Sequence, residues 1–240
     1  MNHMAFHIVF SISGRIFRQK WFYLSAVVMV FCLWMELDAD AIRSKTDSFL
    51  LLSAALSGRG SRLSLPLLAS LPFSANAWQE ISSRAAYSCV FRCGYRPYLA
   101  GQLVALFLAA CLSQLLGLLL FLFLLVCLGA PLPLLSMTPF LTAGTQTSLL
   151  TELSSRLLAA ISFAHLGCIG AILTRDAVCA LVIPTAVSFS LSLLTERFFP
   201  ALADMPSGST IPFALARLAV PFFCIVTNGF FLYLEVRRHA

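Results

Sequence analysis

Apolar residues fill most of the chain in long blocks, and charged residues gather between the blocks. A helix that crosses a bilayer needs about 20 predominantly apolar residues, and a somewhat shorter one suffices where Trp or Tyr reaches the interfaces. The blocks therefore predict an all-α membrane protein with six transmembrane helices, in a single transmembrane domain over residues 1–240. The predicted spans cover residues 22–37, 63–78, 101–128, 153–173, 177–194 and 213–234.

The second predicted span is the most irregular of the six. The apolar stretch FLLLSAALS (49–57) is too short to cross a bilayer, and GRGSR interrupts the chain directly after it. The crossing is therefore placed at 63–78, although Pro66 and Pro72 lie inside it. Proline is tolerated in membrane helices where neighbouring groups satisfy the backbone carbonyls that it leaves free.

Composition supports an integral membrane protein. Hydrophobic residues make up 60% of the chain and charged residues only 11%, whereas a soluble domain carries about 25% charged residues. The net charge is +6, but the basic residues sit at the ends of apolar blocks and form no patch. This pattern suits membrane topology, with the lipid bilayer as a partner, and predicts no nucleic-acid binding.

The basic residues also predict the orientation in the membrane. Residues 1–20 mix Phe with Arg and Lys, as in an amphipathic helix at the membrane surface. Six spans put both termini on one side, and Lys and Arg are enriched on the cytoplasmic side. A cytoplasmic N-terminus leaves six basic residues outside: Arg43, Lys45, Arg59, Arg62, Arg156 and Arg197. It places nine inside: Arg15, Arg18, Lys20, Arg84, Arg92, Arg96, Arg175, Arg237 and Arg238. Both termini are therefore expected in the cytoplasm, at the plasma membrane.

Several kinds of chemistry have no motif in this chain. No G-x-x-x-x-G-K-[ST] sequence is present to hold ATP phosphates, and no H-E-x-x-H or G-x-S-x-G occurs. Cys89 and Cys93 are spaced unlike a common zinc pair, and no His lies near them. The chain is therefore expected to be no enzyme and to bind neither a metal nor a cofactor of its own.

A few polar residues lie inside the predicted spans. His165, Asn228 and Gln114 could line a substrate path, because polar groups within a membrane often mark one. His165 could act as a proton relay or a ligand contact, but a hydrogen bond to a neighbouring helix is the favoured interpretation. The spacing of Gly167 and Ala171 predicts a close approach between two helices.

The segment WQEISSRAAYSCVFRCGYRPYLAGQ (78–102) is polar and lies between the second and third predicted spans. Its apolar residues recur at helical spacing, while Glu80, Arg84 and Arg92 are expected to face outward. Glu80 is expected at the start of this helix, in reach of Arg84, and Pro97 is expected to end the helix. From the residues alone, the 79–100 segment is either a contact surface for a partner or an ordinary interfacial loop.

The order of several short motifs resembles the membrane permeases of the ABC type-2 transporter family. The motifs are LPLLASLPFSANAWQE, FRCGYRPYLAGQ, LTRDAVCALVIP, LLTERFFPAL and the closing pair Arg237 and Arg238. Two positions depart from the family pattern: Gln102 stands where lysine is usual, and Arg84 stands where glycine is usual.

This resemblance implies an exporter-like bundle with a cytoplasmic coupling helix that touches a separate ATP-binding subunit. It assigns Glu80, Arg84, Arg92 and Tyr98 to that coupling. It also implies a second permease, either an identical or a similar chain, and places ATP and Mg on the partner subunit. The expected function is therefore that of a permease subunit of an ATP-binding-cassette exporter. The alternative is a non-transporting membrane protein of the same fold, such as an immunity or anchoring subunit.

Overall fold

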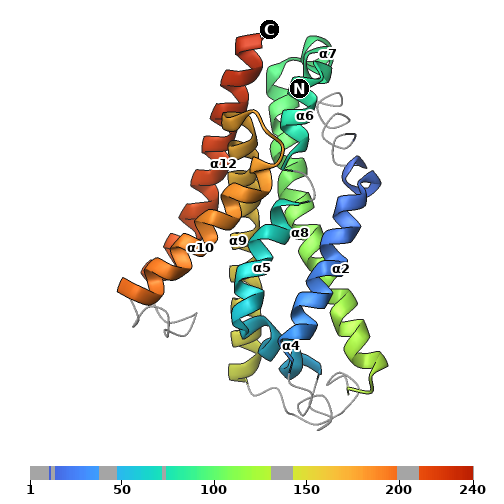
Figure 1. Ribbon diagram of the computed structural model, residues 1–240, viewed down its shortest axis with the longest axis vertical. Helices are drawn as coiled ribbons and strands as arrows, with labels where there is room; N and C mark the ends of the chain where they lie inside the picture. Colours follow the sequence, from blue (N-terminus) through green and yellow to red (C-terminus); the bar gives the residue numbers. More distant parts are fainter. Residues whose placement is uncertain are drawn as a thin grey trace.

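The computed structural model describes residues 11, 14–37, 48–71, 74–130, 143–198 and 211–239, and these residues form helices without any strand. Figure 1 shows the helices as a long bundle. The elements are η1 (Ile16–Arg18), α2 (Lys20–Met35), α4 (Ser48–Ser57), α5 (Arg59–Ser70), α6 (Asn76–Ser82), α7 (Ala85–Cys93), α8 (Tyr95–Cys127), α9 (Ala143–Thr174), α10 (Cys179–Phe198) and α12 (Ile211–His239). Residues 1–10 of the predicted surface helix lie outside the described part of the chain.

Three of these helices contain a stretch long and apolar enough to cross a membrane. The stretches are Tyr95–Cys127 in α8, Leu153–Thr174 in α9 and Ala219–Arg238 in α12. They overlap the predicted spans 101–128, 153–173 and 213–234, and the second agrees to within one residue. The described residues thereby confirm the helical class, and three of the six predicted spans correspond to helices long and apolar enough to cross a membrane.

The other predicted spans correspond to shorter or divided helices. Apolar helices of less than spanning length cover Lys20–Met35 and Cys179–Ser190. Segment 63–78 is divided, because α5 ends at Ser70 and α6 begins only at Asn76. Pro72 itself lies outside the described residues, and Leu71 before it is still helical, with φ of −58° and ψ of −46°.

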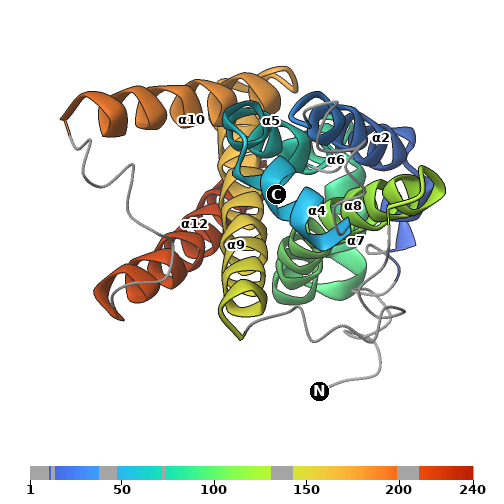
Figure 2. The same ribbon diagram turned by 90° about the horizontal axis from the view of Figure 1, so that it is seen from below.

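Helix α9 lies in the middle of the bundle and packs against α5, α8, α10 and α12, while α2 packs along α8. Figure 2 shows α10 and α12 diverging on one side of α9, with α2 and α8 on the other side. Helices α6 and α7 lie at the same end of the bundle as the C-terminal end of α12, and α4 lies at the opposite end (Figure 1).

The apolar core forms two clusters along the bundle. One includes Phe22, Ile81, Tyr98 and Leu232 and lies toward α6 and α7. The other joins α2, α4, α5 and α8, at the opposite end of the bundle. Its members are Met29, Leu33, Leu51, Leu52, Ala55, Leu56, Leu68, Leu118, Phe121 and Leu125.

Large apolar side chains also cover the outside of the long helices. Phe123 on α8 and Phe223 on α12 are 69% and 71% exposed. Soluble monomers rarely expose extended apolar surface, whereas lipid tails accept it without penalty. These outward faces therefore suit contact with a bilayer.

Glycine residues allow α9 and α10 to approach closely, as the small-residue spacing predicted. A Cβ atom at Gly167 would collide with the backbone oxygen of Ala180 and would lie 3.2 Å from Pro184 Cγ. One turn along the helix, Ala171 is fully buried. Small residues drive such contacts between membrane helices because they let the backbones meet.

Candidate functional site

The predicted coupling segment is two short helices rather than one. Helix α6 ends at Ser82, and α7 begins at Ala85 after Arg84, whose φ of 60° is left-handed. Helix α7 ends at Cys93 and is capped by Gly94, where φ is 83°. The expectation that Pro97 ends the helix is wrong, because Pro97 lies in the first turn of α8, where the missing N–H group leaves no hydrogen bond unmade.

The left-handed conformation of Arg84 makes a testable prediction. A non-glycine residue in this region is strained by about 1–2 kcal/mol, whereas glycine adopts it freely but loses more backbone entropy on folding. The Arg84→Gly variant is therefore expected to unfold at a higher temperature than the parent protein, with a net gain of about 1 kcal/mol. Arg84→Ala is the matched control, since it removes the guanidinium and keeps the strain. Equal melting temperatures for the two variants would contradict the prediction.

Glu80 is the centre of a polar cluster that faces into the bundle. Its Oε1 atom accepts a hydrogen bond and forms an ion pair with Arg15 Nη1 at 2.7 Å. Its Oε2 atom accepts hydrogen bonds from the Tyr98 hydroxyl at 3.1 Å and from Gln102 Nε2 at 2.6 Å. Gln102 Nε2 also lies 3.3 Å from the Tyr98 hydroxyl oxygen.

This geometry corrects three expectations about Glu80. The residue is the fifth of the seven residues of α6 and does not start a helix. It also does not face outward, because its side chain is only 14% exposed and points toward Tyr98 and Gln102. Its ion-pair partner is Arg15, 65 residues earlier in the chain, rather than Arg84. Glu80 thus joins α6 to the start of α8 and to the segment before α2.

The partners of Glu80 differ in their exposure to solvent. Tyr98 and Gln102 are buried in α8, while the Arg15 side chain is 46% exposed. Hydrogen bonds to a charged acceptor are stronger than neutral ones, and a buried donor has no water to replace a lost partner. The bonds from α8 therefore anchor Glu80 more firmly than the screened ion pair with Arg15.

The remaining two predicted coupling residues lie on the outer surface. Arg84 and Arg92 are exposed, and Phe91 beside Arg92 is 95% exposed. Burial raises the pKa of Tyr87, the nearby charge of Glu235 raises it further, and Arg84 acts in the opposite direction. This agrees with the position of α7 at the same end of the bundle as the C-terminal end of α12 (Figure 1).

The predicted path residues do not form one group. His165 and Asn228 are both fully buried, and Asn228 Nδ2 lies 2.8 Å from His165 Nδ1. This contact confirms the favoured interpretation of His165 as a hydrogen-bond partner of a neighbouring helix. Gln114 is also buried, but it lies away from this pair. Gln102 lines one pocket with Asn228, and Gln114 lies 12 residues beyond Gln102 on α8, which is about 18 Å along a helix.

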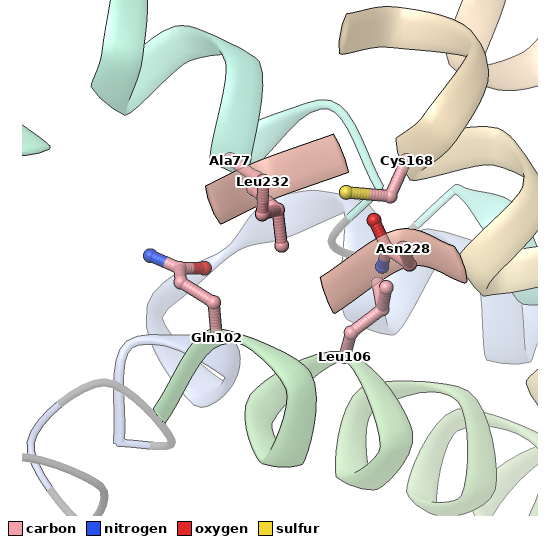
Figure 3. Close-up of a pocket in the computed structure, with 6 residues that line it drawn as sticks. All are labelled: Ala77, Gln102, Leu106, Cys168, Asn228 and Leu232. Carbon is pink, nitrogen blue, oxygen red and sulfur yellow. The ribbon is translucent and has the colours of Figure 1, made fainter. Parts of the chain in front are cut away.

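A small pocket lies between the Glu80 cluster and the pair of His165 and Asn228. It is lined by residues from α6, α8, α9 and α12: Ala77, Gln102, Leu106, Cys168, Asn228 and Leu232 (Figure 3). The sequence pointed to Gln102 only as a departure from a family pattern, although its spacing of four from Tyr98 places both on one helix face. It gave no signal for Arg15, because nothing local marks a contact across 65 residues.

No protein-family model, no curated protein and no solved structure matches this chain.

Proposed function

We propose that this chain is the membrane permease subunit of an ATP-binding-cassette exporter of the type-2 kind. In this proposal six membrane-crossing segments form the bundle, and two permease chains, identical or similar, form the translocation path. A separate subunit binds and hydrolyses ATP with Mg. The protein lies in the plasma membrane with both termini in the cytoplasm.

The observation that carries the proposal is the outer face of α7. Phe91 is 95% exposed there, with the exposed Arg92 next to it and Arg84 at the start of the helix. An aromatic side chain flanked by arginines is typical of the energetically important part of a protein interface. Helices α6 and α7 lie at one end of the bundle (Figure 1), and the proposed topology puts this end in the cytoplasm, where the face would be open to a partner.

The Glu80 cluster supports a role in transmitting motion. A displacement of α7 would move α6, and α6 is tied through Glu80 to Tyr98 and Gln102 at the start of α8. Helix α8 is 33 residues long, or about 50 Å, so it extends across the whole bilayer core of about 30 Å. A partner that pushes on α7 could therefore act on a helix that reaches the far side.

The proposal is tested with the tagged protein purified from its native membrane. It predicts that an ATP-binding-cassette ATPase co-purifies, and that the permease freed of this partner hydrolyses no ATP, since it has no phosphate-binding loop. Phe91→Ser is expected to lose the ATPase, while Phe123→Ser, at an exposed position on α8, is the matched control that keeps it. Co-purification without an ATPase would favour an immunity or anchoring protein, and ATP hydrolysis by the freed chain would contradict the proposal.

The topology is tested with charged maleimides on single-cysteine variants. Cys93 is expected to label only after cells are permeabilised, whereas Cys127, exposed at the opposite end of α8, should label in intact cells. Burial and the neighbouring Cys89 raise the pKa of Cys93, while Arg92 opposes this shift. Burial, the larger of these causes, remains when Cys89 is replaced in the single-cysteine variant. Because the thiolate is the reactive form, the labelling rate of Cys93 should keep rising with pH beyond the ordinary thiol pKa of 9.0. Labelling of Cys93 in intact cells would contradict this topology and indicate the inverted orientation.

A further inference from the structure

Three apolar stripes on the outside of the bundle each end in an exposed basic residue. Each stripe consists of exposed side chains spaced three or four residues apart, which places them on one face of their helix. Starting from the base, the stripes are Lys20, Leu24, Val27 and Phe31 on α2, Arg96, Ala100, Val104 and Phe107 on α8, and Arg237, Tyr233, Phe230 and Val226 on α12. Each base thus continues a line of apolar side chains that suit contact with lipid tails.

The three bases lie at the same end of the bundle. Phe22 near the start of α2, Tyr98 near the start of α8 and Val236 near the end of α12 belong to one core cluster. Figure 1 shows the start of α8 and the C-terminal end of α12 at the same end as α6 and α7. Lys20 is the only Lys or Arg in α2, and Arg96 is the only one in α8. The bases of these two helices therefore mark one leaflet and not both.

The acids described at this end of the bundle pair with other groups. Glu80 forms its ion pair with Arg15, and Glu235 lies 4.0 Å from Arg175. Asp176 accepts a hydrogen bond from a backbone N–H group. Within the part of the chain that the structure describes, no ion pair includes any of the three bases at the stripe ends. Their positive charges are therefore open to an anion outside the protein.

We propose that Lys20, Arg96 and Arg237 bind the headgroups of anionic phospholipids in the leaflet at the α6 and α7 end, with the lipid tails lying along the stripes. Each stripe extends 11 residues from its base, or about 16 Å along a helix. This length matches one leaflet of a hydrocarbon core that is about 30 Å thick. A phosphate group at the end of a tail would therefore meet the base at the end of the stripe.

Aromatic side chains beside two of the bases agree with a position at headgroup level. Trp21, next to Lys20, is 57% exposed, and the Tyr233 hydroxyl accepts a hydrogen bond from Arg237 Nη1 at 3.4 Å. Trp and Tyr are enriched where the bilayer meets water, and long basic side chains reach toward the same level. The inference does not depend on the proposed function, since the three bases lie on α2, α8 and α12 and not on α7.

The experiment is fluorescence quenching of the full chain in vesicles by phospholipids brominated on the acyl chain near the headgroup. The chain has three tryptophans, Trp21, Trp34 and Trp78, so replacing two of them by Phe leaves one reporter. With Trp21 alone, brominated phosphatidylglycerol should bind about five-fold more strongly than brominated phosphatidylcholine, the preference expected for one base near a membrane surface. With Trp34 alone, at the opposite end of α2, the two lipids should quench equally. Equal quenching at Trp21 would overturn the proposal.

Variants of Lys20 separate a local site from the general charge of this end. Lys20→Gln should bring the preference at Trp21 close to one, and Lys20→Arg should keep it. Arg92→Gln is the matched control, because it removes an exposed charge at the same end of the bundle but away from the stripes. A preference that survives Lys20→Gln, or that falls equally in Arg92→Gln, would contradict a lipid site at Lys20.

Spin-labelled phosphatidylglycerol and phosphatidylcholine report on the other two bases, because the labelled lipid held at the protein surface gives a distinct spectrum. Arg96→Gln and Arg237→Gln should each lower the preference of the whole protein for phosphatidylglycerol and leave the preference at Trp21 unchanged. A whole-protein preference unchanged in both variants would refute the sites on α8 and α12. Inorganic phosphate at constant ionic strength should not displace the labelled lipid. Displacement would assign the sites to a soluble phosphate and contradict the proposal.

Discussion

Replacing Glu80 by alanine is expected to produce a large loss of stability, and Glu80→Gln a smaller one. Alanine removes the acceptor of the Tyr98 hydroxyl and of Gln102 Nε2, both of which are buried. A buried donor left without its acceptor costs about 1–3 kcal/mol. Glutamine can still present one oxygen to these donors, but it loses the ion pair with Arg15 and turns an amide nitrogen toward it.

The measurement is thermal unfolding of the purified protein in detergent, followed for Glu80→Ala, Glu80→Gln and Arg15→Ala. We expect melting temperatures to fall in the order parent, Arg15→Ala, Glu80→Gln, Glu80→Ala. Arg15→Ala is the mild control, because a half-exposed ion pair contributes at most about 1 kcal/mol. If Glu80→Ala were as stable as Arg15→Ala, the bonds from α8 would not anchor Glu80.

A functional consequence rests on the proposed permease. In a complex with its ATPase, Glu80→Gln is expected to keep assembly intact, because the exposed face of α7 is unchanged. It should nevertheless lower the coupling of ATP hydrolysis to transport, because α6 is held less firmly to α8. Substrate-stimulated ATPase activity and transport in reconstituted vesicles measure this, with assembly checked in parallel. An assembled mutant complex with unchanged stimulation would limit Glu80 to a structural role.

The second large effect is expected at Gly167, where α9 meets α10. In the Gly167→Leu variant, the side chain would meet the backbone oxygen of Ala180 and the ring of Pro184, and neither can move without displacing α10. Overpacking costs about 1–3 kcal/mol of folding free energy when side chains can adjust. A clash with backbone atoms is expected to cost about 3 kcal/mol or more. We expect Gly167→Leu to lower the melting temperature strongly.

Ala159→Leu is the matched control, because Ala159 is exposed on the same helix. It is expected to melt within a few degrees of the parent protein, since surface substitutions usually change stability by less than about 0.5 kcal/mol. A similar fall in both variants would mean that leucine disturbs α9 itself rather than its contact with α10.

Long apolar blocks predicted the helical class and the three long spanning stretches. Within lipid the backbone must form all of its hydrogen bonds internally. A long apolar block such as 101–128 can do this by folding into a helix, so its length and composition predict one. The same local logic predicted the close approach at Gly167, since a small residue on a helix face permits contact whatever the partner is.

Rules based on single residues failed where two residues close in the sequence could each mark the end of a helix. Pro97 was read as a helix end, but proline fits the first turn of a helix equally well, and Gly94 three residues earlier ends α7. The break at Arg84 gave no local signal, because a left-handed arginine is held there by the packing of its neighbours, such as Ile81 and Ala86, in the core. Propensity alone favours a continuous helix over these residues.

The sequence by itself determined the helical class, the apolar stretches and the residues able to form polar contacts inside them. Only the tertiary structure decided which of those residues meet. Arg15 reaches Glu80 across 65 residues and Asn228 reaches His165 across 63. The reason is physical: hydrophobic pattern fixes which face of a helix is buried, but the partner of a buried polar group depends on how the helices rotate and slide against one another, and that is set by the packing of the whole bundle.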